Sequence, residues 1–315
     1  MSEPLYVVTG AAGFIGSNIV EKLLAEKCRV RGVDNFATGR RENIAPFLGR
    51  MEFVEGDLAD EGVAAEALAG ATYVFHEAAI PSVPKSVDQP LPTNRSCVDA
   101  TLRLLMAARD HKVRRVVIAA SSSAYGDVEV SPKVETLAPR PMSPYAVAKL
   151  TQEYYCQAFS ACYGLETVAL RYFNVFGPRQ DPTSDYAAVI PLFIRLVLSG
   201  KTPVIFGDGT QSRDFTFIDN VVHGNLLAAR APGKFLGEVI NLACGDSITL
   251  NGLVDSINTV LGTAVKAKHG EPRVGDILHS KADISKAKQL LGYAPKVDFM
   301  TGLTRTAEWL KTQVR

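Results

Sequence analysis

The 315-residue sequence has no long apolar run and no excess of charge of either sign. Its apolar runs have the length of strands, whereas a membrane-spanning helix needs about 20 apolar residues in succession. Lysine and arginine together number 34 against 33 acidic residues, so no basic surface for nucleic acid or for a membrane is expected. The first ten residues, MSEPLYVVTG, lack the basic and apolar regions of a signal peptide. We therefore expect neither a membrane nor a nucleic acid as a partner.

Cysteine and histidine are both scarce. The five cysteines are an odd number without a C-x-x-C pair, which favours free thiols and a cytoplasmic protein. The five histidines are scattered without the spacing of metal ligands, so we expect no metal site. What is abundant is apolar: 47% of the residues are hydrophobic, enough for the large core of a globular enzyme.

Short apolar runs alternate with helical segments through the first half of the chain. Helical periodicity occupies the segments between most of these runs, for example residues 14–27 and 97–112. This alternation predicts an α/β fold of the Rossmann type, a doubly wound parallel sheet with helices on both faces. The expected strands are residues 5–8, 29–34, 51–57, 72–78, 114–121, 167–174 and 239–243.

The alternation breaks down from about residue 176, where proline and glycine become frequent. We therefore expect a second, smaller α/β domain that is discontinuous in sequence. The predicted division assigns residues 1–175 and 213–245 to the first domain, and residues 176–212 and 246–315 to the second.

Three glycines at intervals of three follow the first expected strand and open a helix. Gly10, Gly13 and Gly16 are the residues a backbone needs where it approaches a pyrophosphate, and the helix start supplies N–H groups to that anion. Asp34 ends the second strand, where an acid accepts hydrogen bonds from the adenine ribose. A carboxylate repels a 2′-phosphate, so NAD is favoured over NADP, although Arg40 and Arg41 lie close enough in sequence to hold such a phosphate.

The stretch SPYAVAK places Tyr145 and Lys149 one helical turn apart. The spacing alone also fits a chance pair of one packed and one solvated side chain. A free phenol has a pKa near ~10, and a nearby ammonium group favours its ionised form. The pair therefore suits a general base.

These motifs together resemble the extended short-chain dehydrogenase/reductase superfamily. TGAAGFIG, SSSAYG at 121–126 and the Tyr145-x-x-x-Lys149 pair carry the resemblance. RYFNVFGPRQ (171–180), FGDGTQSRDFTFIDN (206–220) and PRVGDILHSKADISKA (272–287) resemble its nucleotide-sugar branch, especially UDP-hexose 4-epimerases that act on N-acetylated sugars. The resemblance implies an NAD-dependent isomerase that works through a transient 4-keto sugar, and a homodimer formed through the helices at 97–110 and 144–162.

The resemblance also implies site residues. Tyr145 would be the base, Lys149 would assist it and hold the nicotinamide ribose, and the hydroxyl of Ser121, with Ser122 and Ser123 as alternatives, would share the proton path. The expected cofactor-binding set is Gly10, Gly13, Phe14, Ile15, Gly16, Asp34, Asn35, Asp57, Leu58, Ala78, Tyr145 and Lys149. The expected substrate-binding set is Ser82, Val83, Lys85, Asn174, Val204, Phe206, Arg213, Arg273, Asp276 and Ser280.

Two positions bear on the details of the site. Cys97 stands where the family usually has an asparagine, which removes an amide or moves its role to Asn94. Ser280 stands where epimerases restricted to plain hexoses carry a tyrosine, so room for an N-acetyl group is expected.

Other activities of the superfamily are less well matched. A 4,6-dehydratase needs an acid pair, and a decarboxylase needs a glutamate, beside the serine run; SSSA offers neither. A reductase that releases its cofactor remains an alternative, and so does a non-catalytic NAD-binding sensor.

Overall fold

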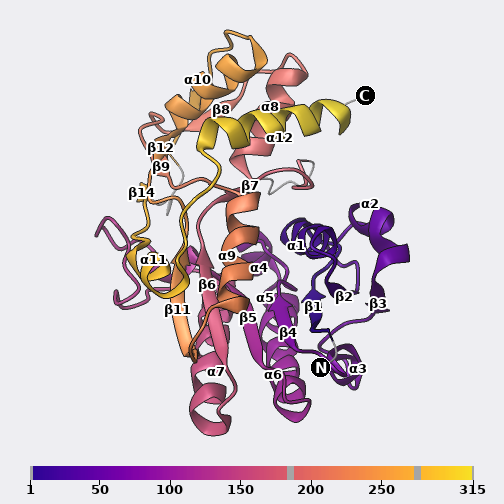
Figure 1. Cartoon of the computed structure of the whole chain (residues 1–315). Coiled ribbons are helices and arrows are strands. Elements are labelled where there is room, and N and C mark those ends of the chain that lie inside the picture. The colour runs from indigo at the N-terminus through magenta and orange to yellow at the C-terminus, as the bar shows by residue number, and fades with distance from the viewer. Residues whose placement is uncertain (1–2, 183–187, 273–277, 314–315) are drawn as a thin grey trace.

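A seven-stranded parallel sheet forms the centre of the molecule in the computed structural model, which describes residues 3–182, 188–272 and 278–313 (Figure 1). The strand order is β11-β6-β5-β4-β1-β2-β3, and every neighbouring pair is parallel. Each predicted run supplies one strand, with ends that differ by up to three residues, which confirms the predicted fold class. The strands are β1 (Leu5–Thr9), β2 (Arg29–Asp34), β3 (Glu52–Glu55), β4 (Tyr73–His76), β5 (Arg115–Ser121), β6 (Thr167–Tyr172) and β11 (Leu236–Leu242).

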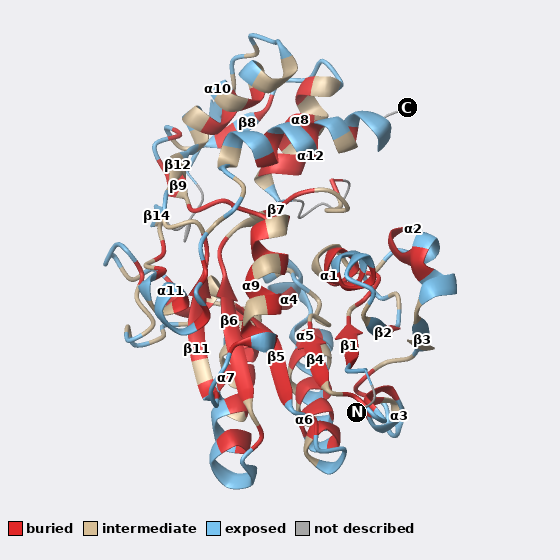
Figure 2. Cartoon of the chain, viewed as in Figure 1, coloured by how far each residue is buried: buried red, intermediate tan, exposed pale blue. Residues whose placement is uncertain are grey.

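The central strands are apolar on both faces because both faces are covered. In β1, Tyr6 and Val8 pack into one hydrophobic cluster, whereas Leu5 and Val7 pack into another on the opposite face. This is why the strand appears in the sequence as a continuous apolar run and not as an alternating one. Figure 2 shows these strands buried and the outer turns of the helices exposed.

Helices cover the sheet in two layers. On the face of Tyr6 and Val8 lie α1 (Phe14–Ala25) and α9 (Ile218–Arg230), which contribute Ile19 and Val221 to the core. On the face of Leu5 and Val7 lie α3 (Val63–Leu68), α6 (Ala100–Asp110) and α7 (Pro144–Tyr163). The sheet is therefore doubly wound, and the loops that follow its strands meet at its carboxyl edge.

A second group of elements lies beyond the carboxyl edge of the sheet, at the top of Figure 1. Its core includes Phe176, Phe215, Phe217 and Phe299, whose rings contact one another. The group comprises α8 (Val189–Leu198), β8 (Val204–Phe206), β9 (Ser212–Arg213), β12 (Ile248–Thr249), α10 (Leu250–Leu261), β13 (Lys268–Gly270), β14 (His279–Ser280) and α12 (Phe299–Gln313), with β7 (Val175–Phe176) and β10 (Thr216–Phe217) beside the sheet.

Short helices complete the connections. They are α2 (Arg41–Ile44), η1 (Ala45–Arg50), α4 (Val83–Asp88), α5 (Pro90–Asn94), η2 (Arg95–Asp99), η3 (Ser122–Tyr125) and α11 (Ser285–Leu291). Within the described ranges, no helix combines the length and the apolar character that crossing a membrane requires.

Candidate active site

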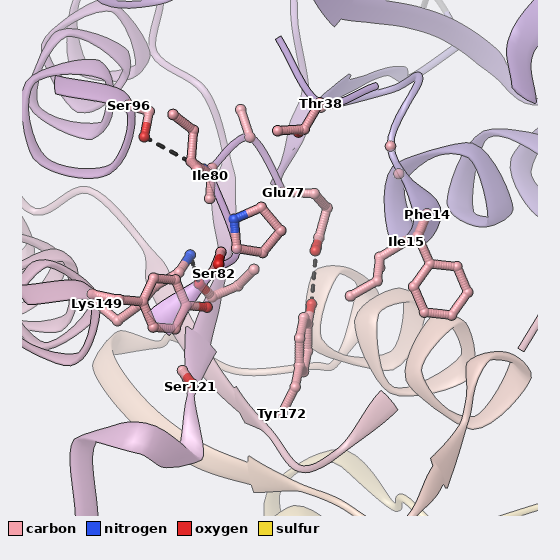
Figure 3. Close-up of a pocket in the computed structure, with 18 of the residues that line it drawn as sticks. Phe14, Ile15, Thr38, Glu77, Ile80, Ser82, Ser96, Ser121, Lys149 and Tyr172 are labelled. Atoms are coloured by element: carbon pink, nitrogen blue, oxygen red, sulfur yellow. Dashed lines mark hydrogen bonds between the residues drawn. The ribbon is translucent and has the colours of Figure 1, made fainter. Parts of the chain in front are cut away.

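One cavity of about 1230 Å³ runs along the carboxyl edge of the sheet. The loops after β1, β2, β4 and β5 form one part of its wall, and α7, Arg213 and Ser280 form another. It therefore joins the glycine loop to the smaller group of elements in a single space. Figure 3 shows part of it, with Phe14 and Ile15 on one side and Lys149 and Ser121 on the other.

The glycine loop is shaped by close backbone contacts. Gly10 has a φ of +64°, and a Cβ there would lie 2.8 Å from the backbone nitrogen of Ala78. A Cβ on Gly16 would lie 2.1 Å from the carbonyl oxygen of Gly10, so no other residue fits without moving the loop. α1 starts at this loop, and no side chain caps it. Its first N–H groups are thus available to an anion, as the pyrophosphate of a dinucleotide requires.

Asp34 ends β2 with a carboxylate that is buried beside the cavity. Its two oxygens accept hydrogen bonds from the N–H groups of Ala12 (2.8 Å) and Phe36 (2.7 Å). Burial raises the pKa of Asp34, and these backbone bonds oppose the rise. Arg40 lines the cavity and pairs with Asp181 at 2.7 Å, whereas Arg41 pairs with Glu55 at 2.6 Å. The Asp34 carboxylate at the end of β2 therefore suits an adenine ribose with two free hydroxyls, as in NAD.

Helix α7 places Tyr145 and Lys149 on its cavity side. Ser143 caps the helix by accepting a hydrogen bond from the N–H of Ala146 (3.1 Å), and Pro144 occupies the first turn. The Lys149 Nζ donates to the carbonyl oxygen of Ala119 (2.8 Å) and lies 5.9 Å from the centre of the Tyr145 ring. The lysine is thus fixed beneath the tyrosine by the end of β5.

The serine run forms its own hydrogen-bonded turn. The Ser123 hydroxyl donates to the Ser121 Oγ (2.9 Å), and the Ser123 N–H donates to the same oxygen (3.2 Å). Burial raises the pKa of the Tyr145 phenol, and the Ser121 hydroxyl opposes the rise. Of the three serines, which all line the cavity, Ser121 is thus the one that acts on the tyrosine.

Burial dominates the electrostatics of the pair. It raises the pKa of Tyr145 above the ordinary value of a phenol, with smaller contributions from Cys97 and Glu77. Burial also lowers the pKa of Lys149. A nearby ammonium charge favours the ionised phenol, as expected from the sequence, but desolvation is the larger effect in the chain by itself. Tyr145 is therefore a protonated phenol at neutral pH unless a further positive charge lies beside it.

The structure brings most predicted site residues together. Every described member of the predicted cofactor set lines the cavity, and so do Ser82, Val83, Lys85, Asn174, Arg213 and Ser280. Val204 and Phe206 do not line it; they lie on the exposed side of β8, with only Ile205 buried. Arg273 and Asp276 fall outside the described residues.

The cavity also contains residues that the sequence reasoning missed. Glu77 and Tyr172 meet across it, and Ser96 lines it near the start of η2 (Figure 3). Lys133 lines it too, although only 3% of its surface is exposed. Glu77, Ser96 and Lys133 belong to none of the quoted motifs, and Tyr172 lies in RYFNVFGPRQ but was not singled out. The strand order brings Glu77 to the site, and the pairing of residue 133 with the segment after β14 brings Lys133 there.

The segment around Cys97 departs from a regular helix. Cys97 is buried in the π-helical turn η2, and its carbonyl oxygen accepts bonds from Thr101 (2.5 Å) and Gln152 (3.0 Å). Asn94 is exposed and does not line the cavity; its amide contacts Asp99. Asn94 therefore presents no amide to the cavity, and Arg95 and Ser96 are the polar side chains of this segment that line it.

Comparison with known proteins identifies the family to which this fold belongs. The profile of the NAD dependent epimerase/dehydratase family matches residues 6–243. The chain belongs to this family. The match spans the glycine loop, Asp34 and the Tyr145–Lys149 pair, so the predicted family and its NAD cofactor are confirmed.

Members of this family resemble the chain over nearly its whole length. A UDP-glucose 4-epimerase from Mycolicibacterium smegmatis is 36% identical over 313 residues, which cover 98% of each chain. The structure of a UDP-N-acetylglucosamine 4-epimerase from Methanobrevibacter ruminantium, in complex with UDP-N-acetylmuramic acid, is 41% identical with a TM-score of 0.94, covering 99% of this chain and 100% of the other. A UDP-glucuronic acid 4-epimerase from Bacillus cereus, bound to UDP-glucuronic acid and NAD, is 33% identical with a TM-score of 0.91, covering 98% and 99%.

Proposed function

We propose that this family member is a UDP-hexose 4-epimerase that passes through a transient 4-keto sugar. The observation that supports this most strongly is the Tyr145–Lys149–Ser121 arrangement in a cavity that also reaches Arg213 and Ser280. Tyr145 takes the proton of the C4 hydroxyl through the hydrogen bond it shares with Ser121. The glycine loop, Asp34 and Lys149 would hold NAD, which would supply a reversible hydride acceptor and, in its oxidised form, one positive charge in the cavity.

The electrostatics of the chain suit this proton transfer in both directions. Burial raises the pKa of Tyr145, so the phenol holds its proton until the added charge and Lys149 favour the tyrosinate. Without that added charge, burial would keep the proton on Tyr145, and the same residue would return it to the oxygen on C4.

The remaining cavity residues have proposed roles toward the sugar nucleotide. Lys85 and Arg213 would contact the diphosphate, because ammonium and guanidinium groups suit phosphate oxygens. Asn174 has a φ of +33°, which presents its amide at the turn after β6, and its Nδ2 donates to the carbonyl oxygen of Asp214 (3.2 Å). Ser82 caps α4 through the N–H of Lys85 (3.2 Å) and so fixes the start of the loop near the sugar.

We propose an N-acetylated hexose as the preferred substrate. Ser280 pairs with Arg213 in register between β14 and β9 and lines the same cavity as Tyr145. A serine leaves the space that a tyrosine ring would fill, and its hydroxyl can meet an amide. The 41% identity to a UDP-N-acetylglucosamine 4-epimerase supports this choice over UDP-glucose alone.

Lys133 favours a second candidate, a hexose that bears a carboxylate. Burial lowers the pKa of this lysine, and its backbone N–H donates to the carbonyl oxygen of Lys281 (2.7 Å), beside Ser280. An amine held against the sugar end of the cavity would pair with an acidic substituent. UDP-glucuronate is therefore included among the substrates to be tested.

The decisive experiment incubates the purified protein with each UDP-hexose and follows both epimers by proton NMR. We expect interconversion of UDP-N-acetylglucosamine and UDP-N-acetylgalactosamine without added cofactor, with some activity on the plain hexoses. Ser280→Tyr should abolish turnover of the acetylated pair and spare the plain pair, because an overlapping ring blocks closure. Ser280→Ala, which keeps the space, is the matched control and should retain both. Equal loss on both pairs in Ser280→Tyr would show that this position does not select the sugar.

We also propose the assembly and the domain division. Exposed apolar side chains on the outer faces of α6 and α7, among them Met106, Val147 and Tyr154, support a homodimer through these helices. Sedimentation of Val147→Glu against the unmutated protein tests it. The proposed division is an NAD-binding part (residues 1–175 and 213–245) and a nucleotide-sugar-binding part (residues 176–212 and 246–315). The position of α8, β8, α10 and α12 beyond the carboxyl edge of the sheet supports it, whereas α11 lies beside β11 (Figure 1).

A further inference from the structure

Glu77 occupies the position between the two ends of the cofactor cavity. It follows β4, which lies between β1 with the glycine loop and β5 with Ser121. A dinucleotide with its pyrophosphate on the glycine loop and its reactive ring beside Tyr145 has to cross the carboxyl end of β4. Glu77 lines the cavity at this crossing (Figure 3).

The carboxyl group of Glu77 is held on one side only. The Tyr172 hydroxyl donates to its Oε1 (2.9 Å) or to the Oδ1 of Asn225 (3.0 Å), and the Asn225 Nδ2 donates to that hydroxyl (2.8 Å). Among the residues that the structure describes, the Oε2 is buried and has no hydrogen-bond partner. A buried acceptor without a partner is costly, so this oxygen calls for a ligand group or a charge in the cavity.

The titratable groups around Glu77 are few. Lys149 and Tyr145 act on it from α7, and Tyr172 from β6. The segment Phe14–Ile15 at the start of α1 brings no titratable side chain, and Asn225 on α9 is neutral. His76, its neighbour in sequence, bonds to Thr101 of α6 on the other face of the sheet. Burial raises the pKa of Glu77 to about 7, against the smaller effects of Tyr172 and Lys149.

We propose that Glu77 is a positioning residue whose charge sets the preference of the site for oxidised over reduced NAD. The inference rests on the family's NAD cofactor and not on the identity of the sugar. NAD⁺ takes up two electrons and one proton to become NADH, and the ring loses its positive charge in that step. A carboxylate beside the ring stabilises the charged form alone, whereas a protonated carboxyl favours neither.

The size of the effect follows from the surroundings. Two unit charges a few ångström apart in a partly buried site interact strongly enough to change the ratio of the affinities for oxidised and reduced NAD on the order of 10-fold. A 10-fold ratio corresponds to about 30 mV in the midpoint potential of a two-electron couple. By linkage, Glu77 has a lower pKa beside oxidised cofactor than beside reduced cofactor. The shift in midpoint potential therefore develops as pH rises between these two pKa values.

The test measures the midpoint potential of the cofactor in the holoenzyme, from its absorbance against redox dyes, with free NAD as the reference. Over about pH 5.5 to 8.5 the bound potential should fall relative to free NAD by about 30 mV as Glu77 ionises. Glu77→Gln should lie at the high value throughout and show no such step. Glu77→Asp, which keeps the charge, should retain the step and serves as the second variant if the glutamine form retains NAD poorly.

Two controls separate charge from packing. Tyr172→Phe removes the hydrogen bond and keeps the carboxyl, so the step should persist and move to higher pH. Glu66→Gln, a change at an exposed position of α3, should match the unmutated protein. A step that survives in Glu77→Gln, or a Glu77→Gln potential equal to that of Glu66→Gln at the alkaline end of the range, would overturn the proposal. Neither readout needs a sugar, so a failure here is distinct from a failure of the proposed epimerase activity.

Discussion

The ion pair between α7 and β6 provides the sharpest test of how the site is held. Glu153 lies one turn beyond Lys149 on α7, and Arg171 lies on β6. The Arg171 Nε and Nη2 donate to the two oxygens of Glu153 at 2.8 and 2.7 Å, and the side chains are only 3% and 2% exposed. The guanidinium also stacks over Tyr125 at 4.5 Å. This pair ties the helix that carries Tyr145 to the sheet.

Glu153→Gln keeps the volume of the side chain and leaves the buried guanidinium without its counter-charge. Burial alone would lower the pKa of Arg171, and the hydrogen bonds and charge of Glu153 raise it instead above its usual value. Breaking such a pair costs about 3–5 kcal/mol in the free energy of unfolding, whereas replacing both members by apolar residues is often neutral. We therefore expect a loss of about 3–5 kcal/mol for Glu153→Gln and a much smaller one for Glu153→Leu with Arg171→Met.

The assay is urea denaturation followed by circular dichroism at constant pH. Glu26→Gln is the matched control, because its pair with Arg230 at 2.7 Å is about one-third exposed and should contribute less than about 1 kcal/mol. A loss below about 1 kcal/mol in Glu153→Gln, with an unchanged denaturant slope, would refute the reasoning. So would a double variant that is less stable than the single one.

Three further predictions concern the cofactor and the base. Tyr145→Phe should retain NAD and lower turnover by roughly 10²–10⁴, measured by NMR, and near-normal turnover would remove this residue as the base. Asp34→Ala should weaken NAD retention, measured by dialysis and absorbance, with sugar binding intact; unmutated protein that prefers NADP would contradict the role of Asp34. In cofactor-free protein, Glu77 has a pKa of about 7 against 4.5 unfolded, so its contribution to stability is present below pH 4.5 and lost as pH rises through 7. The difference in free energy of unfolding between Glu77→Gln and the unmutated protein, measured by urea denaturation, should therefore shift by roughly 1–3 kcal/mol in favour of the variant from pH 4.5 to pH 8. The same difference at both pH values would contradict this.

The sheet was predictable because its strands are buried on both faces. Continuous apolar runs such as LYVV mark strands of this kind, and helical periodicity fills the gaps between them. β11 begins at Leu236, three residues earlier than expected. The early start was not predicted because Gly237 and the charged Glu238 interrupt the apolar run. Pairing with β6 across a bulge holds these residues in the strand, and local sequence does not report such pairing.

The site was predictable only where it lies in compact motifs. The glycine loop, Asp34 and the Tyr145–Lys149 spacing each follow from a local physical need. Glu77 and Lys133 belong to the cavity through strand order and a distant chain return. Desolvation of Tyr145 was missed for the same reason, because the burial of a side chain depends on elements far away in sequence.

The position of β11 has a consequence for the order in which the protein is made. β11 pairs with β6, yet residues 173–235 separate the two strands in the chain. At about 5–20 residues per second, the ribosome needs several seconds to supply β11 after β6 has emerged. During that interval β6 is an apolar strand with a free edge, the kind that pairs with other chains. Nascent chains of this protein should therefore depend on chaperones most strongly between the synthesis of β6 and that of β11.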